Sequence, residues 1–332
     1  MFNLDAQIAA DETQIAPSAA QSAAGIERLL LRGVFRSRIA DTEKAASEAE
    51  RLVRNAPGEG LAYLVRAQTR ASFHLFSAAL DDLDQAHKLG ADKQQIDSER
   101  AAVLQAVGQY DEALLIRQEA AQRSSTFQTT AALATLHAER RDLSLAERFF
   151  DRSKVLYRGV SPFPLALLDF QRGHLWHSEG RLTRARTWYL AALNRLPQFV
   201  TAQGHLAEVY AASGNIESAI ARLRSLVTTS DDPEFAALLA RFLRSAGRIE
   251  ESSLWLAEAA ARYQELTQKH PEAFADHAAE FWLLDDPNPE RALCYAELNL
   301  AIRKTTRARG LLRQARRASS SVMSKRSGIP GS

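Results

Sequence analysis

Small and large apolar residues recur along the chain at helical spacing and also at a longer fixed period. The pattern is clearest in two neighbouring units, which begin at Ala166 and Val200, 34 residues apart. The first unit carries, in order, Gly173, Trp176, Gly180, Ala185, Tyr189, Ala192 and Pro197. The second carries Leu206, Ala207, Tyr210, Gly214, Ala219, Leu223 and Leu226. A glycine divides each unit into two helical segments, so each unit predicts a helical hairpin.

The same period extends over most of the chain. Units begin near Ile26, Gly60, Gln94, Phe127, Ala166, Val200, Pro233 and Ala273. Successive starts are 34, 34, 33, 39, 34, 33 and 40 residues apart. Because a single hairpin cannot bury its apolar face, such units must stack against their neighbours. The sequence therefore predicts an all-α solenoid of about eight helix-turn-helix units over residues 26–305.

Proline positions support these boundaries. The prolines at predicted junctions are Pro57, Pro162, Pro164, Pro197, Pro233 and Pro271, while Pro287 and Pro289 fall in the predicted turn of the last hairpin. A proline inside a helix costs about 3 kcal/mol, and the predicted helices avoid that cost. Runs of alternating β-branched residues with hairpin dipeptides are missing from the sequence, which also favours an all-α fold.

The unit resembles the tetratricopeptide repeat, a family that places a small residue and an aromatic on its first helix and a glycine at the turn. Residues 166–199 match that pattern best, and the resemblance covers roughly residues 26–305. It implies a right-handed superhelix whose first helices line a concave groove, where ligands of the family usually bind. It also places Trp176 and Tyr189 at structural positions, so we expect both in the core.

Two spacings exceed the regular period. The excess before Ala166 contains Pro162 and Pro164, which exclude a continuous helix there. We expect either a lengthened helix followed by a rigid hook, or a hinge, at residues 158–165. The excess before Ala273 falls in residues 257–270, whose Ala, Leu and charged residues predict one continuous helix.

The two ends differ from the repeat array. Residues 1–25 are rich in Ala, Gln and Ser and predict a poorly ordered leader. Residues 306–332 predict a basic capping helix and a disordered tail. Nine basic residues and no acidic one lie at 303–332: Arg303, Lys304, Arg307, Arg309, Arg313, Arg316, Arg317, Lys325 and Arg326. We favour a solvated basic tail, with contact to the acidic body or to an acidic partner as alternatives.

Composition narrows the function classes. A net charge of +2 gives no overall attraction to nucleic acid or membrane, so nucleic-acid binding is disfavoured. The single Cys294 excludes an internal disulfide and any zinc site built on several cysteines. The N-terminus lacks a secretory signal, and no apolar run is long enough for a membrane span, so we expect a cytoplasmic location. Phosphate loops, dinucleotide fingerprints and nucleophile elbows are missing, so we expect no catalysis and no resident cofactor.

The candidate binding residues follow from the resemblance, which turns the first helices toward the groove. The candidates for a partner-binding surface are Phe163, Phe170, His174, His177, His205 and Glu208. His174 and Glu208 are 34 residues apart and should be neighbours on adjacent helices, while His174 and His177 share one helix face. These side chains suit a polar ligand-binding patch or ordinary packing, and three histidines with a carboxylate leave a zinc site as a weak alternative.

The function that these features favour is an interaction scaffold that binds a peptide or partner protein on the concave face. An accessory subunit that positions the catalytic partner of an enzyme complex is the alternative. A metal-dependent activity at the histidines and Glu208 ranks last. The sequence leaves the identity of the partner and the oligomeric state open.

Overall fold

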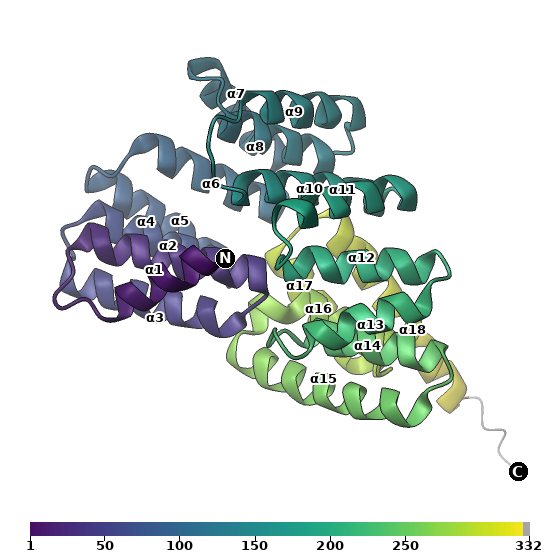
Figure 1. Cartoon of the computed structure of the whole chain (residues 1–332). Helices are drawn as coiled ribbons and strands as arrows, with labels where there is room; N and C mark the ends of the chain where they lie inside the picture. The colour runs from purple at the N-terminus through teal and green to yellow at the C-terminus, as the bar shows by residue number, and fades with distance from the viewer. Residues whose placement is uncertain (328–332) are drawn as a thin grey trace, which may run out of the picture.

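The computed structural model describes residues 1–327, with side chains for all of these except residue 2 and residues 321–327. Eight helical hairpins follow one another (Figure 1). Their first helices are α2 (Ala19–Arg36), α4 (Gly60–Ser72), α6 (Lys93–Val107), α8 (Phe127–Glu139), α10 (Phe163–Ser178), α12 (Val200–Ala212), α14 (Pro233–Ser245) and α16 (Pro271–Leu284). Their second helices are α3 (Ile39–Asn55), α5 (Phe76–Lys88), α7 (Tyr110–Arg123), α9 (Leu143–Leu156), α11 (Leu182–Arg195), α13 (Ile216–Leu226), α15 (Ile249–Lys269) and α17 (Pro289–Ile302).

The predicted all-α solenoid of eight hairpins is confirmed. Helices α4, α8, α12 and α14 begin at the residues where the period placed them, and the other first helices begin within a few residues of their predicted starts, α2 at Ala19 excepted. Helix α15 runs without a break through residues 257–270, as its composition predicts. No helix within the described residues is long and apolar enough to cross a membrane.

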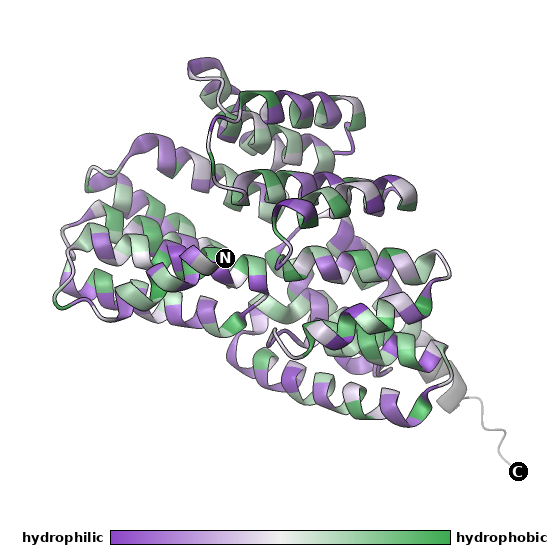
Figure 2. Ribbon diagram, viewed as in Figure 1, coloured by the Kyte–Doolittle hydropathy of each residue, from purple (hydrophilic) through white to green (hydrophobic). Residues whose placement is uncertain are grey.

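One alanine on each second helix lets the two helices of a hairpin approach closely. These alanines have no exposed surface: Ala45, Ala79, Ala113, Ala146, Ala185, Ala219, Ala259 and Ala292. A larger side chain at such a position would push the helices apart, because protein interiors are close-packed. Figure 2 shows hydrophobic and hydrophilic positions interspersed along each helix. The expected core positions Trp176 and Tyr189 are both buried.

The first helices form the inner layer of the solenoid. Each of α4, α10 and α12 contacts the first helix of a neighbouring hairpin, whereas the second helices of neighbouring hairpins do not make comparable contacts in the described chain. A stack in which one layer is more closely spaced must curve toward that layer. The side chains that the first helices turn away from the hairpin cores therefore face the inside of the curve.

The curve closes on itself, because three turns near the N-terminus contact three junctions near the C-terminus. The turn of the first hairpin meets the junction between α13 and α14: Ser230 Oγ donates to the carbonyl oxygen of Ser37 at 2.5 Å. The carboxylate of Asp231 accepts from the backbone N–H groups of Ile39 and Ala40 at 2.6 and 2.9 Å, at the start of α3. An anion at this position also interacts favourably with the helix dipole.

The other two turns repeat this contact. In the second hairpin, His74 Nδ1 donates to the carbonyl oxygen of Glu272 at 3.0 Å, and the ring of Phe73 stacks on that of His270 with centroids 4.2 Å apart. In the third, the N–H of Lys304 donates to the carbonyl oxygen of Val107 at 3.0 Å. The bonded residues are 191–198 positions apart at all three places, so one turn of the superhelix takes roughly this length of chain.

The residues at these contacting turns have a left-handed backbone: Ser37 has φ 47°, His74 has φ 56° and Gly108 has φ 91°. Such a conformation is strained for a residue with a Cβ atom, and glycine avoids the strain. At Gly108 the absent Cβ also matters for closure, since a Cβ there would lie 3.0 Å from the carbonyl oxygen of Lys304.

Two expectations about irregular segments need correction. Residues 1–25, expected to be a poorly ordered leader, form α1 (Phe2–Glu12) and the start of α2, because Leu4 and Ile8 bury their side chains against α2. No lengthened helix precedes residues 158–165: α9 ends at Leu156 after 14 residues, and the excess residues form a short loop in which Tyr157 Oη donates to the carbonyl oxygen of Ser161.

At the other end, α18 (Thr306–Ser327) continues the array as the basic capping helix, and it buries Leu311, Leu312 and Ala315 against the last hairpin. The tail expected to be disordered falls partly within this helix, and residues 328–332 lie outside the described residues.

Replacing Gly108 with alanine tests the closure. Gly108→Ala should lower the free energy of unfolding by about 1–2 kcal/mol for the left-handed backbone and by about 1–3 kcal/mol more for the clash with Lys304. Gly180→Ala is the matched control, since Gly180 has φ 69° and a Cβ there meets nothing within 4 Å. Equal losses for the two variants in urea denaturation would show that the turn and the junction do not touch.

Candidate functional site

The histidines and the glutamate predicted from the repeat come together on the inner layer. His177 lies on α10, and His205 and Glu208 lie one turn apart on α12. A nitrogen from each imidazole and an oxygen of the carboxylate all lie within 4.8 Å of one another. His205 Nδ1 and Glu208 Oε2 are 2.7 Å apart, which makes them a hydrogen-bonded pair. We call these three residues the histidine cluster.

Two glycines set the spacing of the helices that carry this cluster. Gly173 precedes His174, and a Cβ at position 173 would come within 2.6 Å of the Tyr189 ring. Gly204 precedes His205, and a Cβ at position 204 would come within 2.5 Å of the Phe235 ring. Both aromatic rings occupy the space that glycine leaves. The packing of α11 on α10 and of α14 on α12 therefore fixes where the histidines lie.

Aromatic rings surround the histidine cluster. The ring of Tyr189 stacks on that of His205 with centroids 5.7 Å apart, and Tyr189 Oη lies 3.3 Å from His177 Nδ1. Phe170 packs against Phe199 at 5.0 Å and against His205 at 5.5 Å. Phe170 is half-buried in this packing, so it supports the cluster and is less available as an exposed anchor.

Burial and neighbouring charges shift the pKa values of these histidines. Burial, with the nearby His205 and Arg307, lowers the pKa of His174 to about 4, although its side chain is exposed. Burial also lowers the pKa of His177. Burial acts the same way on His205, but its hydrogen bond to Glu208 and the negative charges of Glu208 and Glu234 together outweigh burial and raise the pKa.

A second group of charges continues this surface. On α16, Asp276 and His277 are adjacent, and Asp276 lies 3.3 Å from the guanidinium of Arg303. His277 Nδ1 lies 3.9 Å from the carboxylate of Glu234, on α14. Arg307, on α18, donates to Glu280 at 2.9 Å. We call Glu234, Asp276, His277, Glu280 and Arg307 the charged wall.

The histidine cluster and the charged wall are electrostatically connected. The positive charge of Arg307 acts to lower the pKa of both His174 and His205, whereas the negative charge of Glu234 acts to raise that of His205. Arg241, on α14, helps to lower the pKa of Glu208. Helix α12 contacts both α10 and α14, and α16 contacts α18. Together these helices carry the polar side chains of the inner layer.

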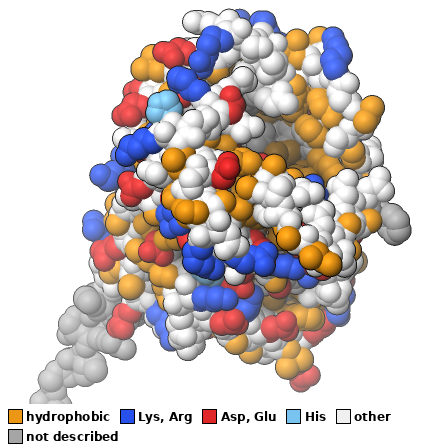
Figure 3. Space-filling model, turned by 90° about the vertical axis from the view of Figure 1, so that its left-hand side faces the viewer, with side chains coloured by type: hydrophobic (Ala, Val, Ile, Leu, Met, Phe, Trp, Pro, Cys, Tyr) orange, Lys and Arg blue, Asp and Glu red, His pale blue; other side chains and the backbone are white. Residues whose placement is uncertain are grey.

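Phe163, the sixth predicted residue, lies elsewhere. Its ring packs on that of Phe35 with centroids 5.1 Å apart, so it joins α10 to α2. Beside it is a pocket of about 300 Å³, lined by side chains of α2, α7, α8 and α10 such as Leu31, Arg117 and Thr135. Figure 3, which looks onto the side of the molecule where the N-terminal hairpins lie, shows a hollow bordered by hydrophobic side chains, with charges of both signs mixed around it.

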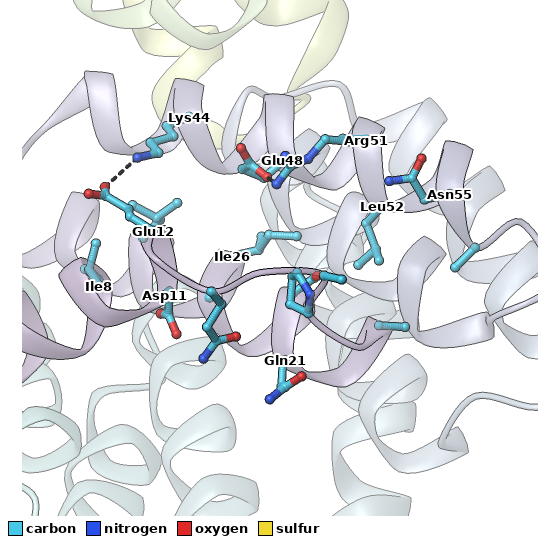
Figure 4. Close-up of a pocket in the computed structure, with 18 residues that line it drawn as sticks. Ile8, Asp11, Glu12, Gln21, Ile26, Lys44, Glu48, Arg51, Leu52 and Asn55 are labelled. Carbon is cyan, nitrogen blue, oxygen red and sulfur yellow. Dashed lines mark hydrogen bonds and ion pairs between the residues drawn. The ribbon is translucent and has the colours of Figure 1, made fainter.

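A larger pocket, of about 790 Å³, lies between α1, α2 and α3 (Figure 4). Its charged side chains neutralise one another. Asp11 binds Arg28 at 2.6 Å, Glu12 binds Lys44 at 2.5 Å, and Glu48 binds Arg51. These ion pairs occupy the charged side chains of the pocket, and its lining includes none of the residues predicted from the repeat, so the polar surface on the inner layer remains the candidate site.

The charged wall was not predicted from the sequence. Arg241 could have been found, because it lies 33 residues after Glu208, which is the spacing between those two units. His277 could not, since the last unit begins 40 residues after the one before it and the register is lost there. Arg307 belongs to the basic capping helix, whose contact with the inner layer the charge pattern alone does not reveal.

Asp276 should keep His277 protonated at neutral pH. Asp276 is the largest influence on His277 and, with Glu234 and Asp232, raises its pKa to about 9 against burial and Arg307. In Asp276→Asn the pKa of His277 should fall by at least one unit, measured by NMR titration of the imidazole carbons. A pKa of His277 near 6.5 in the unsubstituted protein would contradict this geometry.

The pair also contributes a pH dependence of stability. A raised pKa stabilises the folded state below about pH 6.5, and this contribution is lost as the pH rises toward 9. The pKa of Asp276 is lowered to about 2, so its contribution is present above about pH 4 and is lost toward pH 2. The contribution of the pair is therefore largest between about pH 4 and 6.5.

Comparison with known proteins finds a family model that matches part of the chain. Residues 177–242 match the family model of the tetratricopeptide repeat. This segment contains part of α10, all of α11, α12 and α13, and most of α14. A comparison with curated protein sequences finds no match.

Solved structures share the fold at low sequence identity. A human IFIT1 dimer with m7Gppp-AAAA has 16% sequence identity and a TM-score of 0.59, and the match covers 91% of this chain and 72% of that one. The APC/C hetero-tetramer Cut9–Hcn1 has 15% identity and a TM-score of 0.50, with 93% of this chain and 50% of that one covered. These likenesses show the all-helical repeat architecture.

Proposed function

We propose that this tetratricopeptide repeat protein is an interaction scaffold that binds a polypeptide partner on the inner surface formed by the histidine cluster and the charged wall. Proteins built from these repeats are generally protein-interaction scaffolds. The proposal adds the place and the chemistry of binding. It assigns the chain no reaction of its own.

This proposal rests on the solvent exposure of the polar side chains on the inner layer. His205 and Glu208 keep 23% and 27% of their side-chain surface exposed, and His277 keeps 37%. Polar groups that are held in place by packing and remain accessible can exchange water for a ligand at a small entropic cost.

The balance of charge favours a polypeptide over RNA, the ligand named for human IFIT1. Phosphate binding needs lysine and arginine side chains that are not already neutralised. On this surface Arg307 binds Glu280 and Arg241 binds Asp285, while Glu208, Glu234 and Asp276 add negative charge. A chain of phosphates would meet more carboxylates than guanidinium groups on this surface, five against two.

An accessory role inside a larger complex is the second form of this function. The solved Cut9–Hcn1 structure is a hetero-tetramer, which shows that a fold of this kind is used in assemblies. In that case the partner would be a stable subunit of the complex.

Substitutions on the inner surface should weaken partner binding. We expect His174→Ala combined with Glu208→Gln to reduce affinity for the partner at least tenfold, because both residues offer accessible polar atoms and neither fills the core. The measurement is affinity capture from cell lysate with intact and substituted protein as bait, followed by binding isotherms for each recovered protein.

The matched control replaces exposed residues of two second helices, His87→Ala on α5 with Glu119→Ala on α7. It should recover the same partners as the intact protein. If the inner double variant binds as tightly as the control, the inner surface is not the binding site. Recovery of RNA instead of protein would overturn the choice of polypeptide.

A further inference from the structure

We propose that the histidine cluster is a binding site for a divalent transition metal ion, with zinc the ion that suits it best. The proposal concerns His177, His205 and Glu208 and does not depend on whether the inner surface binds a polypeptide. From the sequence alone a zinc site is a weak alternative, because the spacing of these residues follows from the repeat. The structure adds the distances.

One potential ligand atom from each residue of the histidine cluster converges on the same place. His177 comes from α10 and the other two residues from α12, so the site joins two hairpins. The three ligand atoms already lie within 4.8 Å of one another. Tetrahedral zinc holds nitrogen and oxygen ligands at about 2.0–2.1 Å, which places the ligand atoms about 3.3 Å apart. Side-chain rotations can supply the difference without moving either helix.

The types of side chain in the cluster also suit zinc. Two imidazoles and one carboxylate form a common set for zinc with three protein ligands and one water molecule. His205 Nδ1 and Glu208 Oε2 are now held 2.7 Å apart by a shared hydrogen bond. A metal ion would take the place of that proton, with a separation of the two atoms larger by about 0.6 Å.

The hydroxyl of Tyr189 also orients the imidazole of His177. Tyr189 is fully buried, and its Oη lies 3.3 Å from His177 Nδ1. When Nδ1–H donates to this hydroxyl oxygen, the lone pair of Nε2 is left for a metal ion. Partners of this kind fix the tautomer and the ring orientation of histidine ligands in metal sites.

Among the described residues, no lysine or arginine forms an ion pair with the carboxylate of Glu208. Arg241 helps to lower the pKa of Glu208, but its Nε and its Nη2 both donate to Asp285 at 2.7 Å. His174 is near the cluster, with its ring centroid 5.5 Å from that of His205, but it is not one of the three converging residues.

The test uses the full chain, freed of any histidine tag and stripped with EDTA, and titrated with zinc chloride in a calorimeter. We expect one zinc ion per chain. His177→Ala and Glu208→Gln should each weaken binding at least about tenfold, whereas His87→Ala, an exposed histidine on α5, should not change it. Cobalt(II) in place of zinc should give the intense visible absorption of a four-coordinate site.

Glu208→Gln keeps the shape of the side chain, so it decides the matter if His177→Ala fails to fold by circular dichroism. The proposal is overturned if the intact protein binds no zinc with one-to-one stoichiometry. It is also overturned if Glu208→Gln binds zinc as tightly as the intact protein, or if the cobalt spectrum is the weak one of six-coordinate solvent-exposed ions.

Discussion

The close approach of helices at small residues is the constraint on which this structure depends. Each hairpin has at least one fully buried alanine on its second helix, and each buries much of its remaining apolar surface against its neighbours. The same device places the functional side chains. Because Gly173 and Gly204 admit the rings of Tyr189 and Phe235, α10 and α12 lie where their histidines and Glu208 converge.

Closure turns this local packing into an interior. A repeat array that did not meet itself would have an open groove, and the groups along it would be fully hydrated. Here three turns bind three junctions roughly one superhelical turn away, with Asp231 at the first and His74 at the second. The groups inside are consequently desolvated but still accessible. Neighbouring charges then separate the pKa values: burial lowers that of His174, whereas Asp276 outweighs burial and raises that of His277.

Much of the fold could be predicted because it rests on local regularity. The period located Gly60, Phe127 and Val200 as helix starts, and it identified Tyr189 as core. Closure could not be predicted, since it joins residues such as Ser37 and Ser230 that are 193 positions apart and have no pattern in common. The leader was misjudged for a related reason: the two buried side chains that hold α1 give too little periodic signal in an alanine-rich segment.

The residues of the candidate site were likewise predictable only in part. His177, His205 and Glu208 follow the repeat register, and the structure brings them together. Phe163 follows the same register but packs against Phe35, because closure brings the first hairpin across to α10. The charged wall escaped the sequence analysis because α16 and α18 depart from the period.

The central claim, that the partner binds on the inner surface, is tested most directly by histidine NMR. The chain has eight histidines, each of which gives a separate imidazole signal. On addition of a partner recovered by affinity capture, we predict shifts for His174, His177, His205 and His277, with His87 on α5 unchanged. Shifts confined to His87 would place the partner on the outer helices and contradict the account.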